Sequence, residues 1–213
     1  MNQSKKENLD PINWKEIFEK IPDEVKISWR TLRGSYNTYL LNVKELSDIL
    51  EFIEDEPAPA LDETDSYEIL QGRLHNYLAS SYTLEQNIET ILRDLGGEAY
   101  DEYNSKFKSN IAHRRIRGLR LFAQHNRPLY FEYKVDEDSN YEVEEIRIDL
   151  ESLLEEKEDW DNDAIKHFFD QELQSSSYVD VVNAIKQHIE LIGEMKDWIK
   201  TQISNYDDRK DDG

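Results

Sequence analysis

The amino-acid sequence predicts a mainly helical protein that carries one inserted β-hairpin. Three observations lead to this fold class. Apolar residues recur at spacings of three and four over several long segments, as they do on one side of an α-helix. Only the stretch 129–148 changes to an aromatic, partly alternating pattern that is typical of strands. With 213 residues, of which 38% are hydrophobic, the chain is long enough to bury one good core.

Residues 1–60 are predicted to form an N-terminal helical segment followed by an acidic linker. Asp10-Pro11 is a helix-start signal for the apolar positions of Ile12–Ile21, which Pro22 interrupts. A second helix is expected from Asp23 to about Leu50. The stretch 54–64, EDEPAPALDET, contains two prolines, which favour an extended linker outside any helix.

Residues 61–205 are predicted to form the main helical domain, and residues 206–213 a disordered tail. A long helix is expected from Ser66 to Leu95, because its apolar residues form one stripe and Gly96-Gly97 can end it. Its polar side includes Asn76, which is a candidate for pointing into a site. The next helix is expected from Glu98 to the region 124–126, because Pro128 disfavours helix at the residue before it.

The remaining elements follow in order. The hairpin is expected to pair Leu129–Val135 with Tyr141–Ile148 through a turn between them. Asp149 is placed to cap a short helix, and another helix is expected to begin near Asp161. The last long helix is expected over Tyr178–Ile203.

One window stands out chemically, since Asn104–Phe131 contains no Asp or Glu and carries a formal charge of +7, while the remainder of the chain carries −28. An acid-free basic helix in such a chain predicts a site for an anion such as phosphate. The alternative is that its bases pair with acidic neighbouring helices. The basic residues of this window are Lys106, Lys108, Arg114, Arg115, Arg117, Arg120 and Arg127.

Several of these side chains are expected on one side of the helix. Asn110, His113, Arg117, Arg120 and Gln124 recur at spacings of three and four, so they form one polar ridge. We take Arg114, Arg117, Gln124 and Arg127 as candidates for binding phosphate or RNA, with Asn76 and His113 as supporting residues.

The composition limits the function classes. The chain has no Cys, which excludes disulfides and Cys-based zinc sites, and it lacks a Gly-rich phosphate loop and an HExxH pattern, so no metal or cofactor is predicted. No apolar run is long enough to span a membrane and no signal segment precedes the first helix, so a cytoplasmic location without a membrane partner is expected. The net charge of −21 indicates either avoidance of nucleic acid by most of the surface or adaptation to a salty cytoplasm.

Three stretches carry a resemblance to a known family. Arg120 and His125, with four residues between them at the end of a helix, resemble the RxxxxH signature of the HEPN superfamily. The stretch 119–129, LRLFAQHNRPL, is similar to the LRNYAQHxGLPL stretch of uncharacterised bacterial and phage HEPN-like proteins. RLHNYLASSYTLEQN at 73–87 and IDLESLLEE at 148–156, followed by Trp160, are similar to further stretches of these proteins.

The resemblance implies a four-helix-bundle-like HEPN domain, usually a homodimer, with Arg and His from both subunits meeting in a cleft. It implies a protein that acts on or binds RNA. In its catalytic form such a protein is a metal-independent endoribonuclease of a defence or toxin system, and it needs no cofactor. His125 would then be the general acid or base, and Arg120 would hold the scissile phosphate.

Two departures leave the question of enzyme activity open. Leu121 stands where active HEPN motifs carry Asn, Asp or His, and Gln86-Asn87 replaces the family's Asp-His pair. Many HEPN domains are not catalytic, so the alternative function is a non-catalytic helical protein-interaction module. Exposure of the arginines discriminates between the two, since guanidiniums that are all held in internal ion pairs leave none for RNA.

Overall fold

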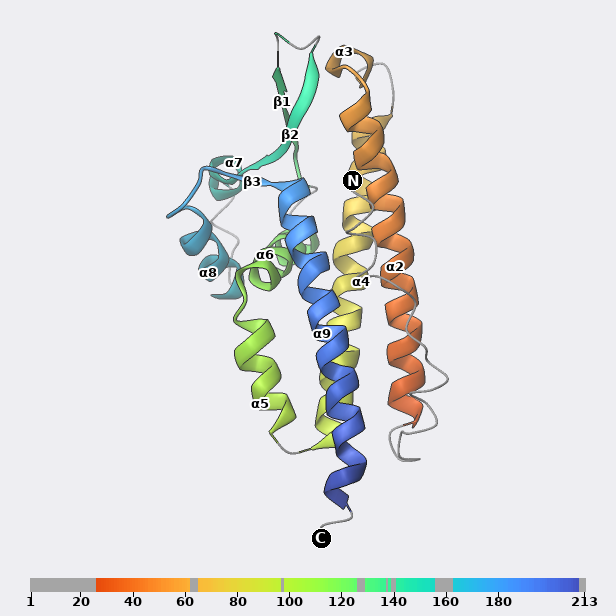
Figure 1. The fold of residues 1–213 in the computed structure, drawn as a ribbon. Coiled ribbons are helices and arrows are strands. Elements are labelled where there is room, and N and C mark those ends of the chain that lie inside the picture. Colours follow the sequence, from red (N-terminus) through yellow and green to blue (C-terminus); the bar gives the residue numbers. More distant parts are fainter. Residues whose placement is uncertain are drawn as a thin grey trace.

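The computed structural model describes residues 26–61, 65–96, 98–125, 129–136, 138, 141–155 and 163–210. Three long helices run side by side along the molecule: α2 (Lys26–Asp55), α4 (Ser66–Leu95) and α9 (Val181–Lys210) (Figure 1). The mainly helical class is therefore confirmed at this level. The predicted first helix at 12–21 and the site residue Arg127 lie outside the described residues.

The helix α4 has the bounds that its apolar stripe and terminal glycines predict. Gly96 follows it with a φ of 68°, a left-handed conformation that costs glycine little. The linker prediction is wrong in part, because α2 runs to Asp55 and a short helix, α3 (Ala58–Leu61), follows. Pro59 fits inside α3 because the first turn of a helix needs no intrahelical N–H donor.

The helix predicted from Glu98 is interrupted. It divides into α5 (Ala99–Tyr103), a π-helical turn η3 (Asn104–Lys108) and α6 (Ile111–His125). Asn110 does not extend a polar ridge, since its Oδ1 accepts a hydrogen bond from the backbone N–H of Ala112 at 2.9 Å and caps α6. The break redirects the chain, so α5 and α6 point in different directions in Figure 1.

The predicted hairpin is present but belongs to a three-stranded antiparallel sheet in the order β1-β2-β3. Strand β1 (Glu132–Asp136) pairs with β2 (Glu142–Asp149), with an irregularity between Lys134 and Val135. Strand β3 (Tyr178–Asp180) pairs with the end of β2, with Ile148 opposite Val179. The last helix therefore begins at Val181 rather than Tyr178, and it continues to Lys210, into the predicted tail.

Two short helices connect β2 with β3. Helix α7 (Leu150–Glu155) starts directly after Asp149, whose carboxylate accepts from the N–H of Glu151 at 3.0 Å and from Ser152 Oγ at 2.7 Å, as expected of a cap. Helix α8 (Asp163–Glu172) packs against α6. Gly118 of α6 permits this approach, because a Cβ there would lie 2.3 Å from Cγ of Phe168.

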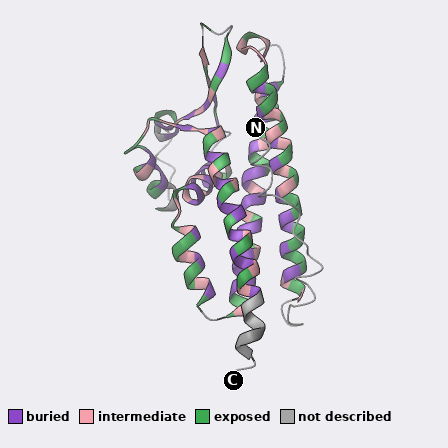
Figure 2. Cartoon of the chain, in the orientation of Figure 1, coloured by how far each residue is buried: buried purple, intermediate pink, exposed green. Residues whose placement is uncertain are grey.

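One core extends through all of these elements. Buried side chains of α2, such as Trp29 and Leu46, belong to the same cluster as those of α4 and α9, across the predicted boundary near residue 61. Figure 2 shows the buried residues of the long helices on their mutually facing sides. None of the described helices combines the length and apolarity that a bilayer crossing requires.

Candidate anion-binding site

Helix α6 lies between α4, α8 and α9, so its basic residues face two different neighbourhoods. Asn110 fixes its first turn, and Ala112, Ile116 and Leu119 supply its buried side. Arg114 and Arg115 reach toward α8 and the start of α9. Arg117 and Arg120 reach toward α4.

The pair Arg114 and Arg115 is engaged within the chain. Arg115 donates from Nε to Glu172 at 2.9 Å and from Nη1 to Gln187 at 3.0 Å. Arg114 donates to Gln171 at 3.2 Å and lies 3.4 Å from Nε2 of His167. Because the carboxylate of Glu172 is buried, the ion pair with Arg115 holds α8 on α6. Arg114 and Arg115 therefore agree with the alternative interpretation of the basic window, in which its basic residues pair with neighbouring helices of the same chain.

Arg117 and Arg120 are held more weakly, by Glu85 and by Tyr82 of α4 respectively. The Cζ of Arg120 lies 3.3 Å from the centroid of the Tyr82 ring, a cation–π contact, and no carboxylate of the described residues is within ion-pair distance of it. Arg117 is 41% exposed and reaches Glu85 only at 4.0 Å. The Nε atoms of both arginines are buried without a hydrogen-bond acceptor. Burial lowers the pKa of Arg120, but a guanidinium remains charged at neutral pH.

These two arginines border a small cavity between α4, α6 and α9. It offers about 20 Å³, which is room for one water molecule and too little for a nucleotide. An anion held by the two guanidiniums would therefore lie at the opening of this cavity and not inside it. The polar lining residues are Ser81, Tyr82, Glu85, His113, Arg117, Arg120 and His188.

Two carboxylates of α4, Glu85 and Glu89, are buried, and Glu85 lines the cavity. Glu85 is 3.3 Å from Nε2 of His113, and Glu89 forms an ion pair with Lys108 of the turn η3. Burial alone raises the pKa of Glu85, but His113, followed by Arg117 and Lys108, lowers it overall. Glu85 is therefore a carboxylate at neutral pH and anchors the η3–α6 junction on α4.

A buried polar contact joins α9 to α4, and a tyrosine of α2 packs beside it. Nδ1 of His188 lies 2.7 Å from the hydroxyl of Tyr77, whose ring is 5.8 Å from that of Tyr39. Burial, reinforced by the charge of His113, lowers the pKa of His188 to about 3. His188 is thus neutral and serves as a hydrogen-bonding core residue rather than as a proton donor near pH 7.

The structure brings together only some of the predicted site residues. Arg117 and Arg120 meet at the cavity, with His113 buried beside them. Asn76 is exposed on α4 and does not line the cavity, so it does not support this site. Gln124 is exposed near the end of α6, and His125 is the last residue of α6, with its side chain outside the described set.

Three residues of the site were not predicted: Tyr82, Glu85 and His188. For Glu85 the signal was available, since Glu85 and Glu89 lie four apart among the apolar positions of α4. Carboxylates on the buried side of a helix require cationic partners. No group of three or more histidines and carboxylates is arranged to hold a metal ion within the described ranges.

Comparison with known proteins gives no relative, as no family model, curated protein or solved structure matches this chain.

Proposed function

We propose that this protein is a HEPN-like RNA-binding protein that holds the phosphate backbone on Arg117 and Arg120. The observation that best supports this proposal is the weak pairing of these two side chains within the chain. They lie one turn apart on α6, beside Tyr82 of α4, with unpaired Nε–H groups and no carboxylate closer than 4.0 Å. Neighbouring guanidiniums whose internal ion pairing is this weak are suited to bind phosphate, which accepts charge-assisted hydrogen bonds.

Cleavage is the catalytic form of the same proposal. His125 follows Arg120 by five residues at the end of α6. In this proposal Arg120 holds the scissile phosphate, while His125 moves the proton of the ribose 2′-OH or of the leaving oxygen. The reaction is that of a metal-independent endoribonuclease. A homodimer, which would bring two such helix ends together, and a cytoplasmic location belong to the proposal as well.

A second function is favoured by a specific observation. Arg114 and Arg115, two of the four arginines between residues 114 and 120, are bound to Gln171 and Glu172 of α8. If the basic window serves mainly to hold α8 in place, the protein is a non-catalytic helical protein-interaction module. The two functions predict different results for variants at Arg117 and Arg120. The RNA-binding function predicts weaker RNA retention, and the interaction module predicts no change.

The binding experiment measures the affinity of purified protein for single-stranded and for structured RNA over a range of salt concentrations. For Arg117→Ala and Arg120→Ala we expect weaker binding and a salt slope reduced by roughly one each, as for loss of one phosphate contact. Arg33→Ala, at an exposed arginine of α2, is the matched control and should leave both unchanged. RNA retention that is absent, or equal in all variants, favours the interaction module.

The cleavage experiment incubates the same RNAs with a metal chelator and compares the protein with His125→Ala. Loss of a general acid or base costs about two to four orders of magnitude in rate. His75→Ala, at an exposed histidine of α4, controls for loss of an imidazole elsewhere. Binding without cleavage leaves the RNA-binding function and removes the nuclease. Undiminished cleavage by His125→Ala excludes the proposed mechanism.

A further inference from the structure

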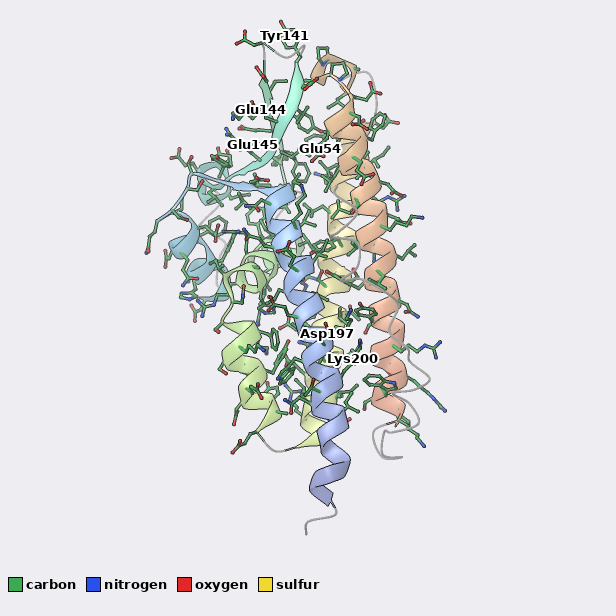
Figure 3. The ribbon with its side chains drawn as sticks, viewed as in Figure 1. Glu54, Tyr141, Glu144, Glu145, Asp197 and Lys200 are labelled. Atoms are coloured by element: carbon green, nitrogen blue, oxygen red, sulfur yellow. The ribbon has the colours of Figure 1, made fainter. Side chains whose placement is uncertain are left out.

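The outer side of α2 carries apolar side chains that are exposed to solvent. Ile27 is 76% exposed, Leu41 56% and Phe52 41%. At 3.6 residues per turn, the three fall within about 40° of one another around the helix, so they share one side. In Figure 3, Glu54 marks the carboxyl-terminal end of α2, and no other described helix or strand lies on this outer side. Single exposed apolar residues are common on protein surfaces, but these three follow a regular spacing.

The three residues belong to a continuous seam along α2 with alternating spacings of four and three. Such a seam repeats every 3.5 residues, as the contact stripe of two supercoiled helices does. All of its residues are exposed except Glu45, which is half-buried beside Arg73 of α4. We name these residues the α2 seam: Ile27, Thr31, Gly34, Thr38, Leu41, Glu45, Asp48 and Phe52.

The α2 seam is complementary to itself when one copy is reversed. The reversal point that matches the two copies lies midway between Thr38 and Leu41. Ile27 of each copy then meets Phe52 of the other, so an apolar pair forms at both ends. Thr38 meets Leu41 on each side of the centre. Every large apolar residue of the seam therefore lies opposite another apolar residue or a threonine.

The polar positions of the α2 seam match in the same reversal. Thr31 lies opposite Asp48, whose carboxylate can accept a hydrogen bond from the threonine hydroxyl. Gly34 lies opposite Glu45, and its missing side chain leaves room for the pair of Glu45 with Arg73. The reversed seam therefore brings no two carboxylates together.

The charges of α2 favour the same direction. Residues 26–44 hold four bases and no acid, whereas residues 45–55 hold five acids and no base. An antiparallel pair places the basic half of one helix along the acidic half of the other, and a parallel pair would place like charges together. The residues are Lys26, Arg30, Arg33 and Lys44 in the basic half, and Glu45, Asp48, Glu51, Glu54 and Asp55 in the acidic half.

We propose that two copies of this chain associate through α2 as an antiparallel helix pair, with the two-fold axis between Thr38 and Leu41. A two-fold contact uses the same patch on both copies, which the reversed α2 seam satisfies. Because α2 and α6 pack on different sides of α4 (Figure 1), this interface leaves the α6 site open. It does not rest on the proposed RNA-binding function, and it differs from a contact that joins the ends of α6.

Light scattering of the purified full-length chain over a dilution series tests the association. We expect a dimer that dissociates on dilution. Leu41→Lys should raise its dissociation constant at least about tenfold, because it places a charge at the centre of the α2 seam. Ile111→Lys, at an apolar residue of α6 that is 46% exposed, is the matched control and should leave the dimer unchanged. A monomer at every concentration, or equal dissociation constants for the two variants, overturns the proposal.

The absence of cysteine allows the direction of the pairing to be tested as well. Thr38→Cys and Thr31→Cys are matched variants, since both threonines are exposed on the α2 seam. At 1.5 Å per residue, the antiparallel pair separates Thr38 from its counterpart in the second copy by roughly 5 Å along the axis, and Thr31 by roughly 25 Å. A short bismaleimide should therefore join two chains through Thr38→Cys at several times the yield of Thr31→Cys. Equal yields, which a parallel pair gives, contradict the proposal, and so does a lack of cross-links in both variants, which copies joined at the ends of α6 give.

Discussion

Helix α4 packs against its two neighbours in two different ways. Toward α2 it presents apolar and tyrosine side chains, such as Tyr77 against Tyr39, and its main ion pair there, Arg73 with Glu45, is partly exposed. Toward η3 and α6 it presents the buried carboxylates of Glu85 and Glu89. The contact of α4 with α2 thus depends mainly on apolar packing, whereas its contact with η3 and α6 depends on buried charges. The two contacts should therefore respond differently to mutation and to pH.

The largest expected difference between the two contacts is electrostatic. Glu85→Ala should lower the free energy of unfolding by about 3 kcal/mol or more, because it removes one partner of a buried charge network. Glu45→Ala, in the partly exposed pair with Arg73, should cost less than about 1 kcal/mol. Urea unfolding followed by circular dichroism measures both. Equal losses would contradict the contrast between the two contacts.

A second comparison uses glycines. Gly118→Ala should lower the free energy of unfolding by about 1–3 kcal/mol, since the new Cβ would lie 2.3 Å from Cγ and 2.7 Å from Cβ of Phe168 on α8. Gly72→Ala is the matched control on α4, where nothing lies within 4 Å, and should raise the free energy of unfolding by about 0.5–1 kcal/mol. The same urea titration tests both, and a stabilising Gly118→Ala would show that α8 can move away from α6.

The last expected effect concerns pH. Because the folded protein holds the pKa of His188 at about 3, below its ordinary 6.5, the unfolded chain takes up a proton that the folded chain does not. Stability should therefore be unaffected by this group above pH 6.5 and decrease as pH falls from 6.5 toward 3, by at most about 1.4 kcal/mol per pH unit. The contribution of Glu85, whose pKa is lowered, is lost only in more acidic solution.

The measurement is the urea midpoint at several pH values between 7 and 5. His188→Gln should make the midpoint less dependent on pH in this range, although the variant is less stable overall. His167→Gln, at an exposed histidine of α8, is the control for loss of an imidazole elsewhere. An unchanged dependence in His188→Gln would assign the acid sensitivity to other groups.

The sequence contained enough information for the long helices and too little for the connections. The apolar stripe and Gly96 predict α4 to the residue, because both signals are local. The break at η3 was not predictable, since Phe107 and Ile111 continue the apolar spacing across it. Strand β3 has three residues, fewer than any periodic pattern needs, and its partner Ile148 is distant in sequence.

The site was predictable only in part for a similar reason. The basic window identified Arg117 and Arg120, because an acid-free stretch is visible in the sequence. It could not show that Arg114 and Arg115 turn toward α8, since 47 acidic residues were available as partners. Tyr82 was hidden because its role depends on how α6 crosses α4, and no local pattern encodes that crossing.

The pairing of β2 with β3 has a consequence for the order of folding. The hairpin of β1 and β2 closes over a short turn, so it can form within microseconds and without the helices. Pairing Arg147 with Asp180 instead requires closure of a loop of roughly 30 residues that contains α7 and α8, and loop entropy opposes this step. Asp180 also caps α9, accepting from the N–H of Asn183 at 3.0 Å. The first turn of α9 is thus expected to become fixed late, after the sheet has closed, and refolding should show this turn gaining protection from hydrogen exchange after α4.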